Sequence, residues 1–189
     1  MSWKLATAPA TEPISLTEAK LHLKMDDITT DDTLITSLIK AARMYCEQYC
    51  NAGFVTQTWE YYLDRFPRVI ELNKFPISAI SIKYYDKDNV EQTLASTVYS
   101  VDMIDSPTRI TLGENQTWPE IEGKLNAIKI TATVGFGAAA DVPDDIKAAI
   151  LLMVGNLYAN RESNVVGRMV TELPFGVKAL LDNRRSFVW

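Results

Sequence analysis

The sequence is poor in the residues and patterns on which catalysis, metal binding and membrane insertion usually depend. It contains one histidine and two cysteines among 189 residues. No apolar run approaches the roughly 18 to 20 residues that would span a bilayer. The N-terminus, Met1-Ser2-Trp3-Lys4, leads into a Thr/Pro-rich stretch without a signal-peptide core. We therefore expect a soluble protein that is made in the cytosol and has no membrane partner.

Neither the cysteines nor the histidine points to a reactive centre. Cys46 and Cys50 lie four residues apart on a predicted helix, where a disulfide would be awkward, and a second Cys or His pair for a metal is missing. We interpret them as reduced, half-buried apolar side chains. His22, flanked by two leucines in a predicted helix, is expected at the surface or its boundary. The sequence accordingly predicts no catalytic residues, no metal and no cofactor.

Neither the acidic pairs nor a glycine pattern requires a metal site or a nucleotide site to explain it. Asp26-Asp27, Asp31-Asp32 and Asp144-Asp145 precede or begin predicted helices, where capping and the helix dipole favour them. Gly135-Phe136-Gly137-Ala138-Ala139-Ala140 fits the loose GxGxxA pattern of dinucleotide-binding folds. In such folds the glycines lead directly into a helix, and a further parallel strand follows. Here Asp141-Val142-Pro143 intervenes and no later strand is predicted, so we interpret the segment as a strand-to-helix hinge.

The formal net charge of −5 weighs against a protein whose main task is to grip nucleic acid. Non-specific affinity for nucleic acid comes from Lys and Arg side chains that neutralise phosphates. A lumen lined with carboxylates would instead keep a duplex from sticking. The charge is therefore compatible with DNA that passes the protein without sequence-specific binding.

Apolar residues at three-and-four spacing predict two long helices and two short ones. A capping signal at Ser15-Leu16-Thr17-Glu18 begins a short helix that runs to about Met25. The next and longest helix ends at Asn51 and Gly53 and carries on one face Leu34, Ile35, Leu38, Ile39, Ala42, Tyr45, Cys46 and Tyr49. The helix after Pro143 has a second apolar face, formed by Ile146, Ala149, Ile150, Met153, Val154, Leu157 and Tyr158. A last short helix places on one face Val177, Leu180 and Leu181.

Between the two long helices the apolar period changes from about 3.6 towards 2, which is typical of strands. The predicted strands are Gln57 to Leu63, Val69 to Leu72, Ala79 to Tyr85, Thr97 to Val101, Arg109 to Leu112 and Asn126 to Val134. Short strands with short links and no helix between them imply antiparallel pairing.

The two long helices each have an apolar stripe that needs a partner, and they most simply pack on each other. The sequence thus predicts an α+β fold in which an antiparallel β-sheet unit is inserted into a helical core. Residues 1–55 would form the first part of the core and residues 56–137 the β insertion. Residues 138–189 would complete the core and add a C-terminal docking tail.

Two C-terminal segments are candidate contacts with other subunits or with a partner protein. The loop from Arg161 to Leu173 contains Val165, Val166, Met169 and Val170, a high apolar content for a free loop, so we expect it to order against a neighbour. The ending Arg184-Arg185-Ser186-Phe187-Val188-Trp189 carries two large aromatic side chains, which favour docking in a groove over exposure at a fraying end.

The order of the sequence signals resembles a known protein family. The signals include Leu16-Thr17-Glu18-Ala19-Lys20, Gln57-Thr58-Trp59, Phe75-Pro76-Ile77, Trp118-Pro119, Gly135-Phe136-Gly137, Tyr158-Ala159-Asn160-Arg161-Glu162 and Leu173-Pro174. Their order and spacing are similar to those of the head-tail connector (adaptor, or head-completion) proteins of tailed phages and prophages, in the variety with a β insertion between core helices. The resemblance covers nearly the whole chain.

The resemblance implies a structural subunit of the virion and not an enzyme. Such subunits are made in the host bacterial cytoplasm and assemble as a ring, commonly of twelve, beneath the portal protein at the head-tail junction; an isolated subunit can stay monomeric until it meets its portal. The ring extends the DNA channel and helps to retain DNA. It also offers a surface to the next neck or tail-completion protein. The family has no catalytic residues.

Other functions stay open at this point. A DNA-packaging or DNA-binding accessory factor would use the C-terminal arginines, and its affinity should fall steeply as salt rises. A ligand-binding β module would line a cleft with the aromatic residues Trp59, Tyr61, Tyr84, Tyr99 and Trp118, although aromatic residues at strand spacing are more often core. An enzyme would need a convergent polar constellation, which the sequence does not supply.

Overall fold

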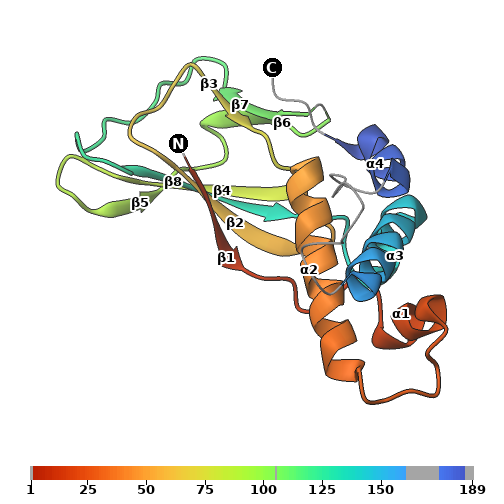
Figure 1. The fold of residues 1–189 in the computed structure, drawn as a ribbon. Coiled ribbons are helices and arrows are strands. Elements are labelled where there is room, and N and C mark those ends of the chain that lie inside the picture. The colour runs from red at the N-terminus through yellow and green to blue at the C-terminus, as the bar shows by residue number, and fades with distance from the viewer. Residues whose placement is uncertain (1, 105, 161–174, 186–189) are drawn as a thin grey trace. The chain divides into compact units, whose positions relative to one another are not determined.

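The computed structural model describes residues 2–104, 106–160 and 175–185 (Figure 1). They fall into two compact units, which we treat separately. Residues 1–10 and 56–135 belong to the first, the β unit, and residues 11–55 and 136–185 to the second, the helical unit. The predicted α+β class is confirmed. Within the described residues no helix is long and apolar enough to cross a membrane.

Two antiparallel sheets make up the β unit (Figure 1). One has five strands in the order β1-β2-β8-β4-β5, and the other has three in the order β3-β7-β6. The five-stranded sheet comprises β1 (Ser2–Thr7), β2 (Gln57–Leu63), β4 (Ile77–Tyr85), β5 (Glu91–Thr93) and β8 (Ile128–Val134). The three-stranded sheet comprises β3 (Val69–Leu72), β6 (Tyr99–Asp102) and β7 (Thr108–Leu112).

One apolar cluster joins the two sheets of the β unit. Ile70 and Ile110 from the small sheet belong to the same buried cluster as Ile82 and Ile130 from the large one. The five aromatic residues that could have lined a ligand cleft, Trp59, Tyr61, Tyr84, Tyr99 and Trp118, all pack against this cluster. Their main structural role is therefore to cover the core.

The six strands predicted from the sequence are present, and two more were missed. The missed strands are β1 and the three-residue β5. Assigning all of residues 1–55 to the helical core was wrong for β1, because Ser2–Thr7 pairs with β2 at the sheet edge. The indole of Trp3 packs 4.9 Å from the ring of Tyr61 and donates a 2.7 Å hydrogen bond to Asn73. Only these long-range partners give the extended N-terminal segment its strand conformation.

The helical unit contains α1 (Leu16–Leu23), α2 (Asp32–Cys50), α3 (Asp144–Ala159) and α4 (Phe175–Leu181). Two short 3-10 helices, Ala139–Asp141 and Asp182–Arg184, precede α3 and follow α4. The apolar stripes of α2 and α3 pack against each other, as predicted, and α4 packs against α3. Both stripes contain buried side chains, such as Ile39 on α2 and Ile150 on α3.

The ends of α1 and α2 follow local sequence rules. At the start of α1 the Ser15 hydroxyl accepts from the Glu18 N–H at 3.1 Å, while the Glu18 carboxylate accepts from the Ser15 N–H at 2.7 Å. This reciprocal pair is the predicted capping box. Helix α2 ends at Asn51, whose φ of 60° is left-handed, a conformation that Asn tolerates better than most residues.

The buried face of α2 is rotated from the predicted one. Tyr45, expected on the apolar stripe, is 42% exposed, whereas Arg43 and Glu47 are buried at 4% and 7%. Arg43 donates to Glu47 at 2.5 Å and to Glu12 at 2.6 Å, and Glu47 also accepts from the Phe54 N–H at 2.9 Å. The charges are tolerated in the interior because each has close partners of the opposite charge or polarity.

Cys46 and Cys50 are free and fully buried, not half-buried as expected. The Cys50 thiol lies 3.9 Å from the Leu181 carbonyl oxygen. Burial raises the pKa of both thiols to about 12. They therefore behave as small apolar side chains at neutral pH.

The Gly135 to Asp141 segment forms a tight turn between β8 and the helix α3. Gly137 has a φ of 134°, and a Cβ added there would meet the Asp141 carboxylate at 2.4 Å. The Asp141 carboxylate instead accepts from the Ala138 N–H at 2.8 Å. The glycine is needed for this turn geometry.

Candidate functional site

The two predicted contact residues that the structure describes, Arg184 and Arg185, sit after α4 and engage the rest of the helical unit. Arg184 forms an ion pair with Asp145 at 2.8 Å, at the beginning of α3. The guanidinium of Arg185 lies 4.9 Å from the centre of the Tyr49 ring on α2. Tyr49 in turn donates a 2.5 Å hydrogen bond to Asp182. The structure thus brings both arginines together at the end of α4.

The electrostatics of this cluster favour a role in holding the C-terminal segment. Burial alone would raise the pKa of Asp145, but the hydrogen bond and charge of Arg184 outweigh it and lower that pKa. The hydrogen bond to Asp182 raises the pKa of Tyr49. The Asp145 carboxylate is therefore ionised at neutral pH and pairs with Arg184. Cations held in this way are poorly placed to neutralise phosphates as well.

The remaining predicted contact residues lie outside the described part of the chain. They are Arg161, Val165, Val166, Met169, Val170, Phe187, Val188 and Trp189. Their role as contacts stays a prediction.

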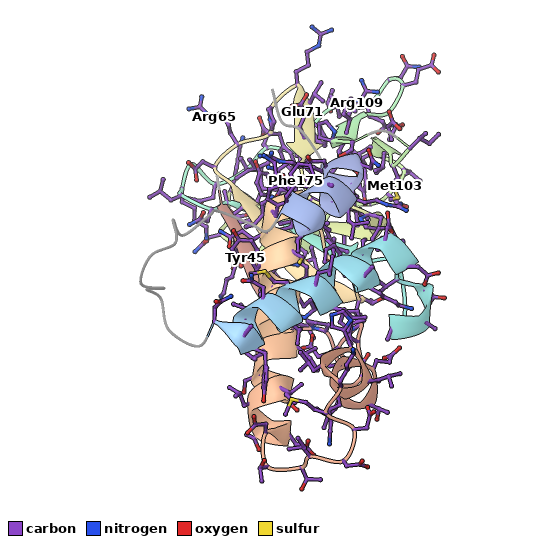
Figure 2. The ribbon with its side chains drawn as sticks, turned by 45° about the vertical axis from the view of Figure 1, so that its right-hand side comes forward. Tyr45, Arg65, Glu71, Met103, Arg109 and Phe175 are labelled. Atoms are coloured by element: carbon purple, nitrogen blue, oxygen red, sulfur yellow. The ribbon has the colours of Figure 1, made fainter. Side chains whose placement is uncertain are left out.

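Large apolar side chains exposed on the helical unit were not singled out from the sequence. Phe175, at the start of α4, is 87% exposed and projects away from the helix (Figure 2). Leu152 on α3 is 41% exposed, and its side chain would touch a Cβ added at the neighbouring Gly176. Met44 and Tyr45 are exposed on the outer face of α2. Of these residues only Tyr45 was placed on a predicted apolar stripe. Periodicity left the other three outside the stripes, but it does not mark such residues as a surface.

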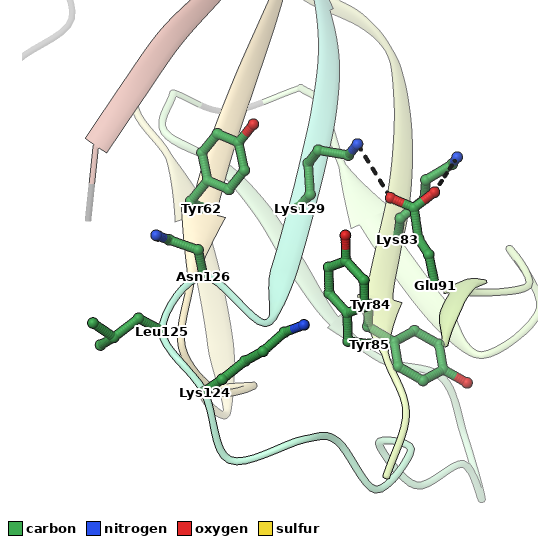
Figure 3. A pocket seen from close by; sticks show the side chains of 9 residues that line it. All are labelled: Tyr62, Lys83, Tyr84, Tyr85, Glu91, Lys124, Leu125, Asn126 and Lys129. Carbon is green, nitrogen blue, oxygen red and sulfur yellow. Dashed lines mark hydrogen bonds and ion pairs between the residues drawn. The ribbon is translucent and has the colours of Figure 1, made fainter. Parts of the chain in front are cut away.

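A pocket on the β unit collects lysine and tyrosine side chains (Figure 3). Its volume is about 420 Å³, and it is lined by Tyr62, Lys83, Tyr84, Tyr85, Glu91, Lys124, Leu125, Asn126 and Lys129. Tyr62, Lys129 and Lys83 are register partners across β2, β8 and β4, so they share one face of the sheet. No local sequence signal marks this site, because these three residues are separated by more than twenty positions in the chain.

The charges in the pocket are organised around Glu91. Its carboxylate accepts from Lys83 at 2.8 Å and pairs with Lys129 at 3.3 Å (Figure 3). The hydrogen bonds of these lysines lower the pKa of Glu91. Lys124 lies over the Tyr85 ring, 3.4 Å from its centre, and donates to Asn89. The lining thus contains three lysines and one glutamate.

The acidic pairs at the helix starts do not assemble a metal site. Asp32 pairs with Lys20 at 2.9 Å, and Asp31 accepts a hydrogen bond from Tyr158. Across the described residues, no group of three or more His, Cys, Asp or Glu side chains is arranged to hold a metal ion. The lone histidine, His22, is exposed on α1, as predicted.

The fold is shared with chains of solved gene transfer agent (GTA) particles. A chain of the neck of an empty GTA particle, in a structure computed with C6 symmetry, superposes with a TM-score of 0.81 and 22% identity. A chain of the native GTA virion gives 0.83 and 22%, and one of the native neck, computed with C12 symmetry, gives 0.75 and 21%. Each match covers 100% of this chain and 97% of the other. No curated protein matches the chain.

At this level of identity the likeness establishes the α+β fold alone. A family model for head completion proteins matches residues 12–170, most of the chain. The chain belongs to the head completion protein family. It is therefore a structural component of the head-to-tail part of a phage or phage-like particle, as the sequence resemblance implied.

Proposed function

We propose that the protein forms a ring beneath the portal protein, extends the DNA channel and joins the head to the next neck or tail-completion protein. The observation that carries the proposal is the family match over residues 12–170. The fold likeness over the whole chain supports it, since two of the similar chains belong to GTA necks computed with C6 and C12 symmetry. A ring of twelve copies is the arrangement most compatible with both symmetries.

A ring requires heterologous contacts, in which one face of each subunit meets a different face of the next. This chain offers two chemically different units for that purpose. The helical unit exposes apolar side chains such as Phe175, and the β unit has a cationic pocket. Distinct faces of this kind allow a ring to close without a second protein between subunits.

DNA would pass through the ring without sequence-specific binding. The net charge is −5, and Arg184 and Arg185 already engage Asp145 and Tyr49. These observations favour a channel through which DNA passes over the alternative of an accessory factor that binds DNA through its C-terminal arginines.

The segments 161–173 and 184–189 remain our proposed contacts with a neighbouring subunit and with the portal protein. The support is their composition: four apolar residues in the first and two aromatic side chains in the second. Deletion of residues 187–189 should reduce portal binding, and limited proteolysis within 161–173 should slow on assembly. Unchanged binding and unchanged cleavage would remove these segments from the contact surface.

The proposed function is tested by mixing the purified chain with its portal ring and imaging the product by electron microscopy. We expect a second ring, coaxial with the portal, with twelve copies of this chain and a continuous central channel. The chain alone serves as the control and is expected to stay monomeric. A chain that binds portal rings at irregular positions, or that leaves the portal rings undecorated even in large molar excess, would contradict the proposal.

A further inference from the structure

The lysine–tyrosine pocket of the β unit is a concentration of positive charge on an acidic protein. Its lining residues include Lys83, Lys124 and Lys129 against Glu91, so the lining carries 3 − 1 = +2. Residues 1–10 and 56–135 contain nine Lys and Arg and eleven Asp and Glu, which gives 9 − 11 = −2 for the whole β unit. Such a reversal of local charge is a recognised feature of surfaces that meet an anionic partner.

The pocket already holds a carboxylate. Glu91 bridges Lys83 and Lys129 at 2.8 and 3.3 Å, and its orientation is visible in Figure 3. Lys124 is engaged only by the Tyr85 ring and the neutral Asn89 amide, so its charge is not balanced by an anion among the described residues. A second carboxylate beside Lys124 would complete the pattern that Glu91 begins.

The surroundings favour a short acidic protein segment over a nucleic acid. DNA affinity needs several phosphates neutralised along an extended cationic track. Here the site is a bounded pocket of about 420 Å³ in a unit of negative net charge. Leu125, at its rim, is 78% exposed and offers an apolar contact that a side chain, but not a phosphate, would use.

The chain itself presents a segment of matching chemistry. The connection between α1 and α2 contains Asp26-Asp27-Ile28, with both carboxylates exposed and Ile28 44% exposed. The later acidic residues of this connection already have partners in their own subunit: Asp31 accepts a hydrogen bond from Tyr158, and Asp32 forms an ion pair with Lys20. Asp26 and Asp27 make no ion pair or side-chain hydrogen bond within the described residues.

We propose that the lysine–tyrosine pocket receives the Asp26-Asp27-Ile28 segment of the next copy of this chain. An Asp carboxylate would pair with Lys124, and Ile28 would cover Leu125. The contact is heterologous, joining the β unit of one subunit to the helical unit of another, which is the type of contact that propagates around a ring. The inference rests on the proposed ring function and identifies one of its subunit contacts.

Charge exchange tests the pairing. The pocket variant Lys124→Glu and the segment variant Asp26→Lys/Asp27→Lys should each lower the yield of portal-bound rings at least tenfold. Combining the three substitutions should restore most of the wild-type yield, because the pair at position 124 is re-formed with opposite signs while Lys129 keeps its ion pair with Glu91. Circular dichroism and thermal unfolding of each variant confirm that the subunit is folded. Asp88→Lys, an exposed acid of the same chain outside both surfaces, is the matched control.

Disulfide crosslinking tests the same contact without changing any charge. Ile28→Cys and Leu125→Cys both replace exposed side chains, while the native Cys46 and Cys50 are fully buried and do not compete. Mixed rings that contain each single variant should yield a disulfide-linked dimer of chains under mild oxidation. Ile28→Cys mixed with Val90→Cys, which is 52% exposed on the same β unit, should not.

The outcomes separate this inference from the proposed function. Normal ring yields from both charge-reversal variants, or a combined variant that fails to recover, would overturn the contact and leave the ring function standing. If the pocket variant fails to assemble while the segment variant assembles normally, the pocket binds a different acidic protein. That result would also overturn the proposed contact between subunits. Loss of DNA retention with normal rings would overturn it in favour of a phosphate site. A wild-type chain that never forms rings would refute both proposals.

Discussion

At the scale of single residues, the buried charges of the helical unit are its most specific feature. Arg43 is enclosed between Glu12 and Glu47, and Glu47 also accepts a backbone hydrogen bond from Phe54. Burial alone would lower the pKa of Arg43, but the two carboxylates more than compensate and raise it. The network ties residues before α1 to the middle of α2 and to the loop after it. One side chain thus fixes three segments of the chain.

Substitution of Arg43 by Ala should therefore destabilise the protein strongly. It leaves Glu47 buried without its cation, and breaking a buried pair in this way costs about 3 to 5 kcal/mol. Lys40→Ala, one turn earlier on the exposed face of α2, is the control and should change the free energy of unfolding by less than about 0.5 kcal/mol. Urea denaturation followed by circular dichroism measures both. Equal midpoints for the two variants would mean that the network does not stabilise the fold.

The buried thiols predict a loss of stability in alkali. Burial raises the pKa of Cys46 and Cys50 to about 12 in the folded chain, from the ordinary thiol value of 9.0. Above pH 9 the unfolded chain therefore releases protons that the folded chain retains, so stability is complete below pH 9 and declines as pH rises towards 12. At pH 10 the expected loss is on the order of 1 kcal/mol per thiol.

Denaturation curves at pH 8, 9 and 10 test this prediction. The variant Cys46→Ala/Cys50→Ala is the control: it has a lower starting stability but should lack the decline between pH 9 and 10. A parallel decline in both proteins would assign the effect to tyrosines or lysines. Native thiols should also resist an aromatic disulfide reagent until the protein unfolds.

At the scale of secondary structure elements, local signals placed the helices and most strands correctly. The capping box at Ser15, the stop at Asn51 and the proline before α3 set helix ends where the structure has them. Strand β1 has no such signal. Its sequence, Ser2–Thr7, is short and not clearly alternating, and it becomes a strand because β2 offers an open edge.

The contribution of β1 can be measured with two neighbouring residues on opposite faces of the strand. Trp3 packs on Trp59 and Tyr61 and donates to Asn73, whereas Lys4 is exposed. We expect Trp3→Ala to lower the free energy of unfolding by about 2 to 3 kcal/mol, below the value for a fully buried tryptophan. Lys4→Ala should have an effect of less than about 0.5 kcal/mol. If Trp3→Ala changed the free energy of unfolding as little as Lys4→Ala, the packing of β1 would not contribute to the stability of the β unit.

At the scale of the whole molecule, each unit is built from segments that are distant in sequence. The helical unit joins residues 11–55 to 136–185, and the β unit joins residues 1–10 to 56–135. The residues with specific roles follow this division. The arginines after α4 serve the helical unit, and the cationic pocket belongs to the β unit.

The acidic character of the molecule predicts weak binding to DNA. At about 150 mM salt we expect a mobility-shift assay with duplex DNA to give a dissociation constant weaker than about 10⁻⁴ M, the upper end of ordinary non-specific binding. Arg184→Ala should lower the melting temperature, because it removes the pair with Asp145, without changing the DNA result. Lys178→Ala, on the exposed side of α4, is the control. Micromolar affinity that weakens in Arg184→Ala would revive the DNA-binding alternative.

The sequence by itself determined the class of fold, the packing of α2 on α3 and the family, because these depend on periodicity and on the order of local signals. It also explained the acids at the helix starts and the glycines before α3. The tertiary structure alone decided which residues became a site. Lys83, Lys124 and Lys129 are ordinary lysines in the sequence, and Arg43 occupies a position that periodicity assigns to the surface. Long-range strand register and helix rotation bring charges together, and neither is encoded in a local pattern.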